Sequence, residues 1–120
     1  MKKKILVVEN DKDISNIISF ILEDEGYEVK TLKSVAGLIE TIITYSPNAI
    51  LLDIIVPGIE DTEICQAIKS AKGINHIPLI VLSTHPAVTA TIKEICADEV
   101  ISKPFDINDL VQIVSEQVAA

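Results

Sequence analysis

The sequence is poor in aromatic residues: Phe and Tyr make up 3% of its 120 residues, and Trp is absent. Single-stranded nucleic acids are usually bound by stacking bases on aromatic side chains, so this activity is not expected here. Positive charge is also scarce, since 10 basic and 18 acidic residues give a formal net charge of −8. Such a balance argues against direct binding to nucleic acid or to an anionic membrane.

Cysteine and long apolar runs are scarce as well. Cys65 and Cys96 are the two cysteines, and their spacing is not that of a metal site, so both are expected to be reduced and buried. No apolar run is long enough for a membrane span or a signal peptide, which predicts a cytoplasmic location. The length and the 48% hydrophobic content predict one domain, residues 1–120, with a full core.

Two apolar patterns alternate along the chain. Short runs rich in β-branched residues predict buried strands at residues 3–8, 27–32, 48–53, 77–82 and 99–102. Apolar residues at helical spacing predict a helix after each strand, with a weaker pattern at residues 88–95. This alternation predicts an α/β three-layer sandwich, in which helices cover both faces of a five-stranded, doubly wound parallel sheet.

Local signals mark the expected helix ends. Ser34 and Asp106 are candidate N-caps, because a short polar side chain can accept a hydrogen bond from the first turn. Asp11 and Asp13 suit the positive end of the first helix. Gly26 is the expected stop of that helix, in a left-handed conformation that glycine adopts easily.

Polar residues follow the predicted strands. The run from Asn48 ends in Asp53, the first strand leads into Glu9 and two further polar residues, and the fourth strand ends in Ser83. Lys103 follows the fifth strand. The carboxyl ends of parallel strands meet at one edge of a sheet, where ligands bind. These side chains are therefore expected to lie together.

Such a group of residues suits phosphoryl transfer. The acidic residues would hold a hard cation such as Mg²⁺, and Asp53 would attack phosphorus to become an aspartyl phosphate. Ser83 and Lys103 would stabilise the phosphoryl oxygens. Each residue also has a purely structural reading, with Asp53 as a turn former and Glu9 and Asp11 as charges at a helix N-terminus. Because all of these residues are expected at one edge of the sheet, a role in phosphoryl transfer is favoured over a purely structural role.

Four stretches together match a known family. They are residues 5–11 (ILVVEND), residues 50–54 followed by Pro57-Gly58, residues 77–83 (IPLIVLS) and residues 97–105 (ADEVISKPF). In this order and spacing, the chain resembles a response-regulator receiver domain of two-component signalling over nearly its whole length. The resemblance implies a flavodoxin-like sheet with strand order 2-1-3-4-5.

The resemblance also implies roles for single residues. Asp53 would be the phospho-acceptor, Ser83 the switch hydroxyl and Lys103 the phosphate-binding lysine. The implied Mg²⁺ ligands are Glu9, Asn10, Asp53 and the backbone carbonyl of Ile55, with Asp11 as a further candidate.

Five positions depart from the family's pattern. Asn10 replaces a second acid and brings no charge, so weaker Mg²⁺ binding is expected. Thr84 is larger than the residue that usually follows the switch hydroxyl, and Val100 replaces an aromatic switch residue. Asp61 and Cys96 stand where the family usually has glycine.

The expected function is a phosphorylation-dependent signalling switch without separate substrate turnover. A sensor histidine kinase or a phosphotransfer protein would supply the phosphoryl group. The face of the fourth helix, fifth strand and fifth helix would pass the signal to a downstream target or effector domain, and homodimerisation through it stays open.

Two alternatives remain. The first is a pseudo-receiver, a constitutive protein-interaction module that is not phosphorylated. The second is a small phosphatase or a flavodoxin-like nucleotide-binding protein. It has little support, because no glycine-rich loop follows the first strand and no acid stands two residues after Asp53.

Overall fold

The computed structural model describes residues 2–54, 59–83 and 96–119. The strands are β1 (Lys4–Val8), β2 (Glu28–Leu32), β3 (Ala49–Ile54), β4 (Leu79–Ser83) and β5 (Glu99–Ser102). The helices are α1 (Lys12–Asp24), α2 (Leu38–Tyr45), α3 (Ile59–Ser70) and α5 (Ile107–Ala119). The helix expected at residues 88–95 lies outside the described residues. In the described part, no helix has the length and apolar character needed to cross a membrane.

The five strands form one parallel sheet in the order β2-β1-β3-β4-β5. The predicted fold class and strand order are therefore confirmed. The central strands β1, β3 and β4 are buried on both faces, which explains their uninterrupted apolar sequences. β2 and β5 lie at the edges of the sheet, and β2 is correspondingly more polar and more exposed.

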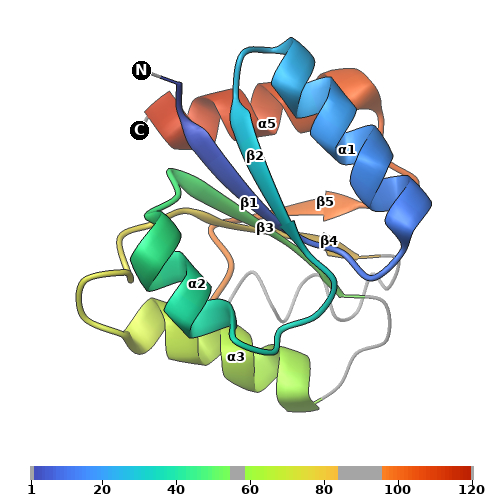
Figure 1. The fold of residues 1–120 in the computed structure, drawn as a ribbon. Helices are drawn as coiled ribbons and strands as arrows, with labels where there is room; N and C mark the ends of the chain where they lie inside the picture. Colours follow the sequence, from blue (N-terminus) through green and yellow to red (C-terminus); the bar gives the residue numbers. More distant parts are fainter. Residues whose placement is uncertain (1, 55–58, 84–95, 120) are drawn as a thin grey trace.

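Helices cover both faces of the sheet, α1 and α5 on one and α2 and α3 on the other (Figure 1). Strand residues alternate between these faces, as the pleat of a strand requires. In β3, Ile50 and Leu52 belong to the core cluster that includes residues of α2 and α3. Ala49 and Leu51 belong to the cluster that includes residues of α1 and α5. The sheet thus separates two hydrophobic cores.

Three of the four expected helix ends agree with the structure. The side chain of Asp11 accepts hydrogen bonds from the backbone N–H groups of Asp13 and Ile14, and so caps α1. Gly26 follows this helix with φ +94°, the left-handed conformation expected of it. At α5, Asp106 Oδ1 accepts from the N–H of Asn108 at 2.7 Å.

The prediction that Ser34 caps the second helix is wrong. α2 begins four residues later, at Leu38, after Gly37 in a left-handed conformation with φ +69°. Ser34 Oγ instead accepts a hydrogen bond from Ala36 N within the preceding turn. Leu38 is 1% exposed, so packing of this residue into the core fixes where the helix starts.

The prediction of two reduced cysteines is also wrong. Cys65 of α3 and Cys96, in the turn before β5, form a disulfide with a Cα–Cα separation of 5.8 Å. Both belong to the core cluster of α2 and α3, so the expected burial is confirmed. The 30 residues between them include β4, and the two cysteines meet in the core on one face of the sheet, which sequence spacing alone does not reveal.

Candidate functional site

Asp53 and Glu9 are brought together by the register of the sheet. Val8 of β1 pairs with Leu52 of β3, so the residue after each, Glu9 and Asp53, lies at the same level of neighbouring strands. Both side chains are almost completely buried, with 1% of Glu9 and 2% of Asp53 exposed. Two acids thus lie side by side at the carboxyl edge of the sheet, as the sequence predicted.

Lys103 supplies the positive charge between them. Its Nζ atom donates to Asp53 Oδ2 at 2.6 Å and to Glu9 Oε1 at 3.4 Å. The position of Lys103 follows from the β4–β5 pairing, in which Ser83 lies opposite Ser102. The backbone N–H of Lys103 donates to the carbonyl oxygen of Ser83 at 2.9 Å, which fixes the start of the loop that follows β5.

Each acid keeps one carboxylate oxygen without a hydrogen-bond partner among the described residues, Oε2 in Glu9 and Oδ1 in Asp53. Buried carboxylate oxygens without partners are costly, so they mark a place where a donor or a cation would be favourable. The pKa of Glu9 is raised to about 8, first by burial and then by the neighbouring carboxylate of Asp53. Lys103 acts in the opposite direction and lowers this pKa.

Asn10 and Asp11 follow directly in the loop after β1. Asn10 is exposed and, with Glu9, lines a polar pocket of about 280 Å³ beside α1 and the end of β2. The carboxylate of Asp11 caps α1 through its Oδ1 atom. With Oδ1 engaged in the cap, Oδ2 is the oxygen of Asp11 that is not used in these two hydrogen bonds.

Ser83 ends β4 next to the acidic residues. It is 1% exposed, and its neighbour in register on β3 is Ile54, the residue after Asp53. The backbone carbonyl of Ile55 is an expected Mg²⁺ ligand, and Thr84 is larger than the residue that usually follows the switch hydroxyl. Both residues lie outside the described part of the chain.

The other departures from the family's pattern have simple local explanations. Val100 is half-buried and packs against the core cluster of α2 and α3. Asp61 lies within α3, where a helical backbone needs no glycine. Among the described residues, Ser46 is the one non-glycine residue with positive φ, so Cys96 does not adopt the conformation that favours glycine.

Oxygen ligands for Mg²⁺ are available at this edge. Two carboxylates with unpartnered oxygens and the amide of Asn10 are the hard donors that Mg²⁺ prefers. The described residues contain no group of three or more His, Cys, Asp or Glu side chains arranged for a metal ion. Two acids and one amide are oxygen donors of the kind that hold a partly hydrated Mg²⁺ ion.

A groove beside Lys103 was not predicted from the sequence. Ile14 and Ile17 of α1 and Phe105 after β5 line it together with Lys103 and Pro104, with a volume of about 480 Å³. Ile17 is 53% exposed although it belongs to the apolar side of an amphipathic helix. The sequence signal for this groove is the apolar side of α1, which is wider than packing against the core requires.

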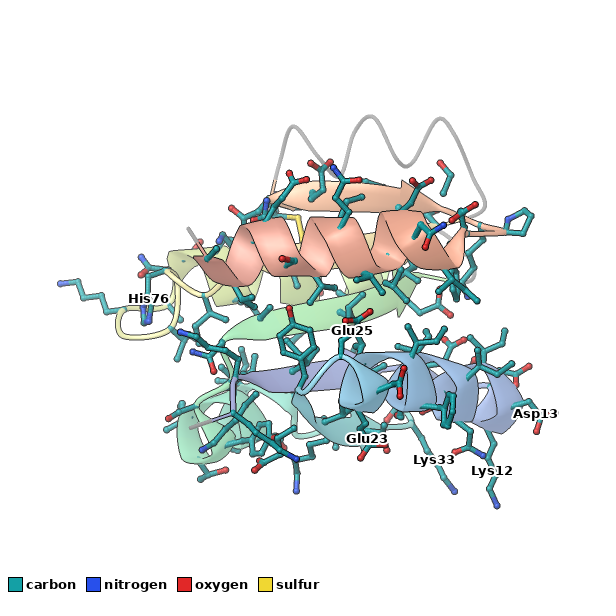
Figure 2. All side chains as sticks on the ribbon, turned by 90° about the horizontal axis from the view of Figure 1, so that it is seen from above. Lys12, Asp13, Glu23, Glu25, Lys33 and His76 are labelled. Atoms are coloured by element: carbon teal, nitrogen blue, oxygen red, sulfur yellow. A yellow bond between two sulfur atoms is a disulfide. The ribbon has the colours of Figure 1, made fainter. Side chains whose placement is uncertain are left out.

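Histidine plays no part at this edge among the described residues. His76 lies in the turn between α3 and β4, at the end of the molecule opposite to Lys12 and Asp13 (Figure 2). His76 is thus a loop residue, and His85 lies outside the described residues.

Comparison with known proteins shows a family match over most of the chain. The family model "Response regulator receiver domain" matches residues 5–115. The receiver domain of a signal transduction histidine kinase from Syntrophus aciditrophicus is similar in structure, with a TM-score of 0.86 and 24% identity over 98% of this chain and 90% of that one.

Two further solved structures are similar. The receiver domain of sensor histidine kinase PA1611 from Pseudomonas aeruginosa, solved with magnesium coordinated in its active-site cleft, has a TM-score of 0.87 and 19% identity, with both chains fully covered. NtrX from Brucella abortus has a TM-score of 0.84 and 26% identity, over 99% of this chain and 27% of NtrX.

Proposed function

Because this chain belongs to the response regulator receiver domain family, we propose that it is a phosphorylation-dependent switch with Asp53 as the phospho-acceptor. The observation that carries the proposal is the buried cluster of Asp53, Glu9 and Lys103 at the carboxyl edge of the sheet. One oxygen of Asp53 is held by Lys103 and the other has no partner in the described part of the chain. The second oxygen is thus available as a nucleophile.

The transfer is a substitution at phosphorus. A bond forms between Asp53 Oδ1 and phosphorus while the phosphorus–nitrogen bond of a phosphohistidine donor breaks. The leaving imidazole keeps the electron pair and takes a proton from solvent. Lys103 then lies within reach of the new phosphoryl oxygens, and Ser83, at the end of the neighbouring strand, is the second group proposed to contact them.

Mg²⁺ is proposed as the cofactor, held by Glu9, Asn10, Asp53 and the backbone carbonyl of Ile55. When bound, it supplies positive charge that offsets repulsion between the Asp53 carboxylate and an anionic donor. The unpartnered Glu9 Oε2 supports this role. Since Asn10 adds no charge, and burial and Asp53 raise the pKa of Glu9, we expect binding weaker than a site with two ionised acids would provide.

A histidine kinase or phosphotransfer protein is the proposed donor. The groove of Ile14, Ile17 and Phe105 supports this, because Lys103 lines the groove and also contacts Asp53. A donor protein seated there would bring its phosphohistidine close to the acceptor. The proposed output is a changed protein-binding face formed by β5, α5 and the region of residues 88–95, read by a downstream target or effector domain in the cytoplasm.

A pseudo-receiver is the second candidate. It is favoured by the charge balance of the site, in which Lys103 already contacts both acids and Asn10 contributes no further negative charge. In that case the same surfaces would bind a partner constitutively, without a cation or a phosphoryl group.

Intact-mass measurement after incubation with acetyl phosphate and Mg²⁺ separates the two candidates. The switch predicts one phosphoryl adduct that disappears when Mg²⁺ is chelated and does not form in Asp53→Asn. This variant keeps the size and an acceptor oxygen for Lys103, so it is a matched control for folding. Absence of the adduct at every Mg²⁺ concentration would overturn the switch and favour the pseudo-receiver.

A further inference from the structure

The Cys65–Cys96 disulfide joins α3 to the turn that leads into β5, two elements 31 residues apart in sequence. In Figure 2 it is drawn as a yellow bond between the sulfur atoms. Cys65 has no exposed surface, whereas Cys96 is 7% exposed. The described residues contain no free cysteine. The pair is therefore a single covalent link with one side closer to solvent than the other.

A second, noncovalent link runs beside the disulfide. One helical turn after Cys65, Lys69 Nζ donates to Asp98 Oδ2 at 2.7 Å, two residues after Cys96. The same Asp98 oxygen accepts from the N–H of Leu79, the first residue of β4, at 2.7 Å. The turn before β5 would therefore remain attached to α3 and β4 if the disulfide were reduced.

A domain of this size with two buried cores is expected to fold without a disulfide. Disulfide staples are typical of small secreted domains that lack a sufficient core. Here the apolar residues Ile5–Val8 of β1, Ala49–Leu52 of β3 and Leu79–Leu82 of β4 are buried between two cores. A receiver that works with a histidine kinase is expected in a reducing compartment, where disulfides are mostly transient and often redox-sensing.

We propose that Cys65 and Cys96 form a reversible redox-modification site that responds to a low-molecular-weight disulfide of the glutathione type. In oxidation, the Cys96 thiolate attacks the small disulfide, forming a mixed disulfide and releasing one small thiol. The Cys65 thiolate then attacks Cys96 Sγ and expels the second small thiol. The sum is two protein thiols plus one small disulfide giving one protein disulfide plus two small thiols.

The order of these steps follows from burial. Exchange requires access to the sulfur that is attacked, and Cys96 is the more exposed partner. In reduction, an external thiolate attacks Cys96 Sγ, and Cys65 leaves as the thiolate and takes up a proton. A second external thiolate then attacks the external sulfur of the mixed disulfide, so that Cys96 leaves as a thiolate and one small disulfide is released. Cys96 is therefore the entry point in both directions.

The link also bears on the phosphoryl site, and this part of the inference rests on the proposed function. Cys96 lies three residues before β5 begins at Glu99, and Lys103 follows directly where β5 ends. β5 is an edge strand, paired with β4 on one side. A covalent anchor at its start restricts the strand that carries Lys103 to Asp53. Reduction leaves the Lys69–Asp98 pair as the remaining described side-chain link between α3 and this turn.

The test equilibrates the full chain in buffers of oxidised and reduced glutathione, blocks thiols with N-ethylmaleimide and measures intact mass. We expect a reversible change between no adducts and two adducts within the range of these buffers. In the reduced protein, peptide mapping should find Cys96 labelled before Cys65. A pair that stays fully oxidised or fully reduced in all buffers, or Cys65 labelled first, would overturn the proposal.

A second measurement compares backbone amide NMR shifts and hydrogen exchange of oxidised and reduced protein. Changes are expected in residues 96–103, with α1 as the internal reference, and they should be absent in Cys65→Ala and in Cys96→Ala. Equal behaviour of the two redox states at residues 96–103 would contradict the anchoring role. Two separate variants are used so that the test remains valid if one of them misfolds.

The effect of the disulfide on phosphorylation of Asp53 is measured separately. The rate of labelling by acetyl phosphate should differ by about threefold or more between the oxidised and reduced protein. If no adduct forms in either state, the proposed function fails while the thiol equilibrium can still be confirmed. If labelling occurs at one rate in both states, the redox coupling fails and the proposed function stands.

Discussion

Lys103 Nζ donates to Asp53 Oδ2 at 2.6 Å, although the two residues are 50 positions apart in sequence. The contact exists because β3 and β5 both flank β4 and end at the same edge of the sheet. Since Lys103 also contacts Glu9, one ammonium group is shared by two buried acidic side chains. Most of the predictions below concern this balance of charge and how a cation, a proton or a substitution changes it.

Replacing Lys103 with Met should destabilise the metal-free protein by about 3 kcal/mol, because it leaves the buried Asp53–Glu9 pair without a counter-charge. Urea denaturation with a chelator present measures the change. Lys69→Met is the matched control, since the Lys69–Asp98 side chains are 21% and 36% exposed and their pair should contribute about 1 kcal/mol or less. Equal losses in the two variants would show that Lys103 is an ordinary surface lysine.

The free energy of unfolding of the metal-free protein should fall as pH rises from about 4.5 to about 8. The pKa of Glu9 is raised from 4.5 to about 8 in the folded state, so between these values the folded chain binds more protons than the unfolded chain. The stabilisation is complete below the unfolded pKa and is lost as pH passes through the folded one. Denaturation series at several pH values test this, and the slope should be reduced in Glu9→Gln. A slope equal to that of wild type would assign the effect to other groups.

Replacing Asn10 with Asp should tighten Mg²⁺ binding by about tenfold or more, because it adds a negative charge beside Glu9. Calorimetric titration measures the dissociation constant. Asn16→Asp is the matched control, since Asn16 lines the same polar pocket on α1 and adds the same charge away from Asp53. An equal gain in both variants would indicate general electrostatic attraction and not ligation at position 10.

Replacing Asp98 with Ala should destabilise the oxidised protein by about 2 kcal/mol, because the N–H of Leu79 and the ammonium of Lys69 lose their acceptor. Leu79 is fully buried, so its N–H has no access to water as a substitute. Asp98→Asn keeps an acceptor for Leu79 and should recover more than half of the loss. If Asn is as damaging as Ala, the charge pair with Lys69 contributes most of the effect.

Much of the fold follows from local sequence signals. The β5 strand was predicted with its observed bounds, Glu99–Ser102, and the other strands differ by one or two residues at their ends. Apolar runs bounded by turn residues are sufficient for this, because strands buried on both faces leave little freedom in residue type. The polar residues at the strand ends, Glu9, Asp53 and Ser83, could be grouped for the same reason.

The contacts between distant elements could not be predicted in the same way. The disulfide depends on how α3 lies against the turn before β5, and the 31-residue spacing of its cysteines carries no such information. The start of α2 depends on the packing of Leu38 and on the left-handed conformation of Gly37, which outweigh the capping preference of Ser34. The shared bonding of Lys103 to both acids likewise requires the register of four strands, β1, β3, β4 and β5.

The division of the interior by the sheet has a thermodynamic consequence. Leu51 and Leu52 are adjacent in sequence, yet one packs with α1 and α5 and the other with α2 and α3. Losses of packing in the two cores should therefore combine almost independently, as they do for sites without shared partners. Both cysteines belong to the α2–α3 core, so the packing of α1 and α5 can vary, in evolution or by design, with little effect on the thiol chemistry of the opposite face.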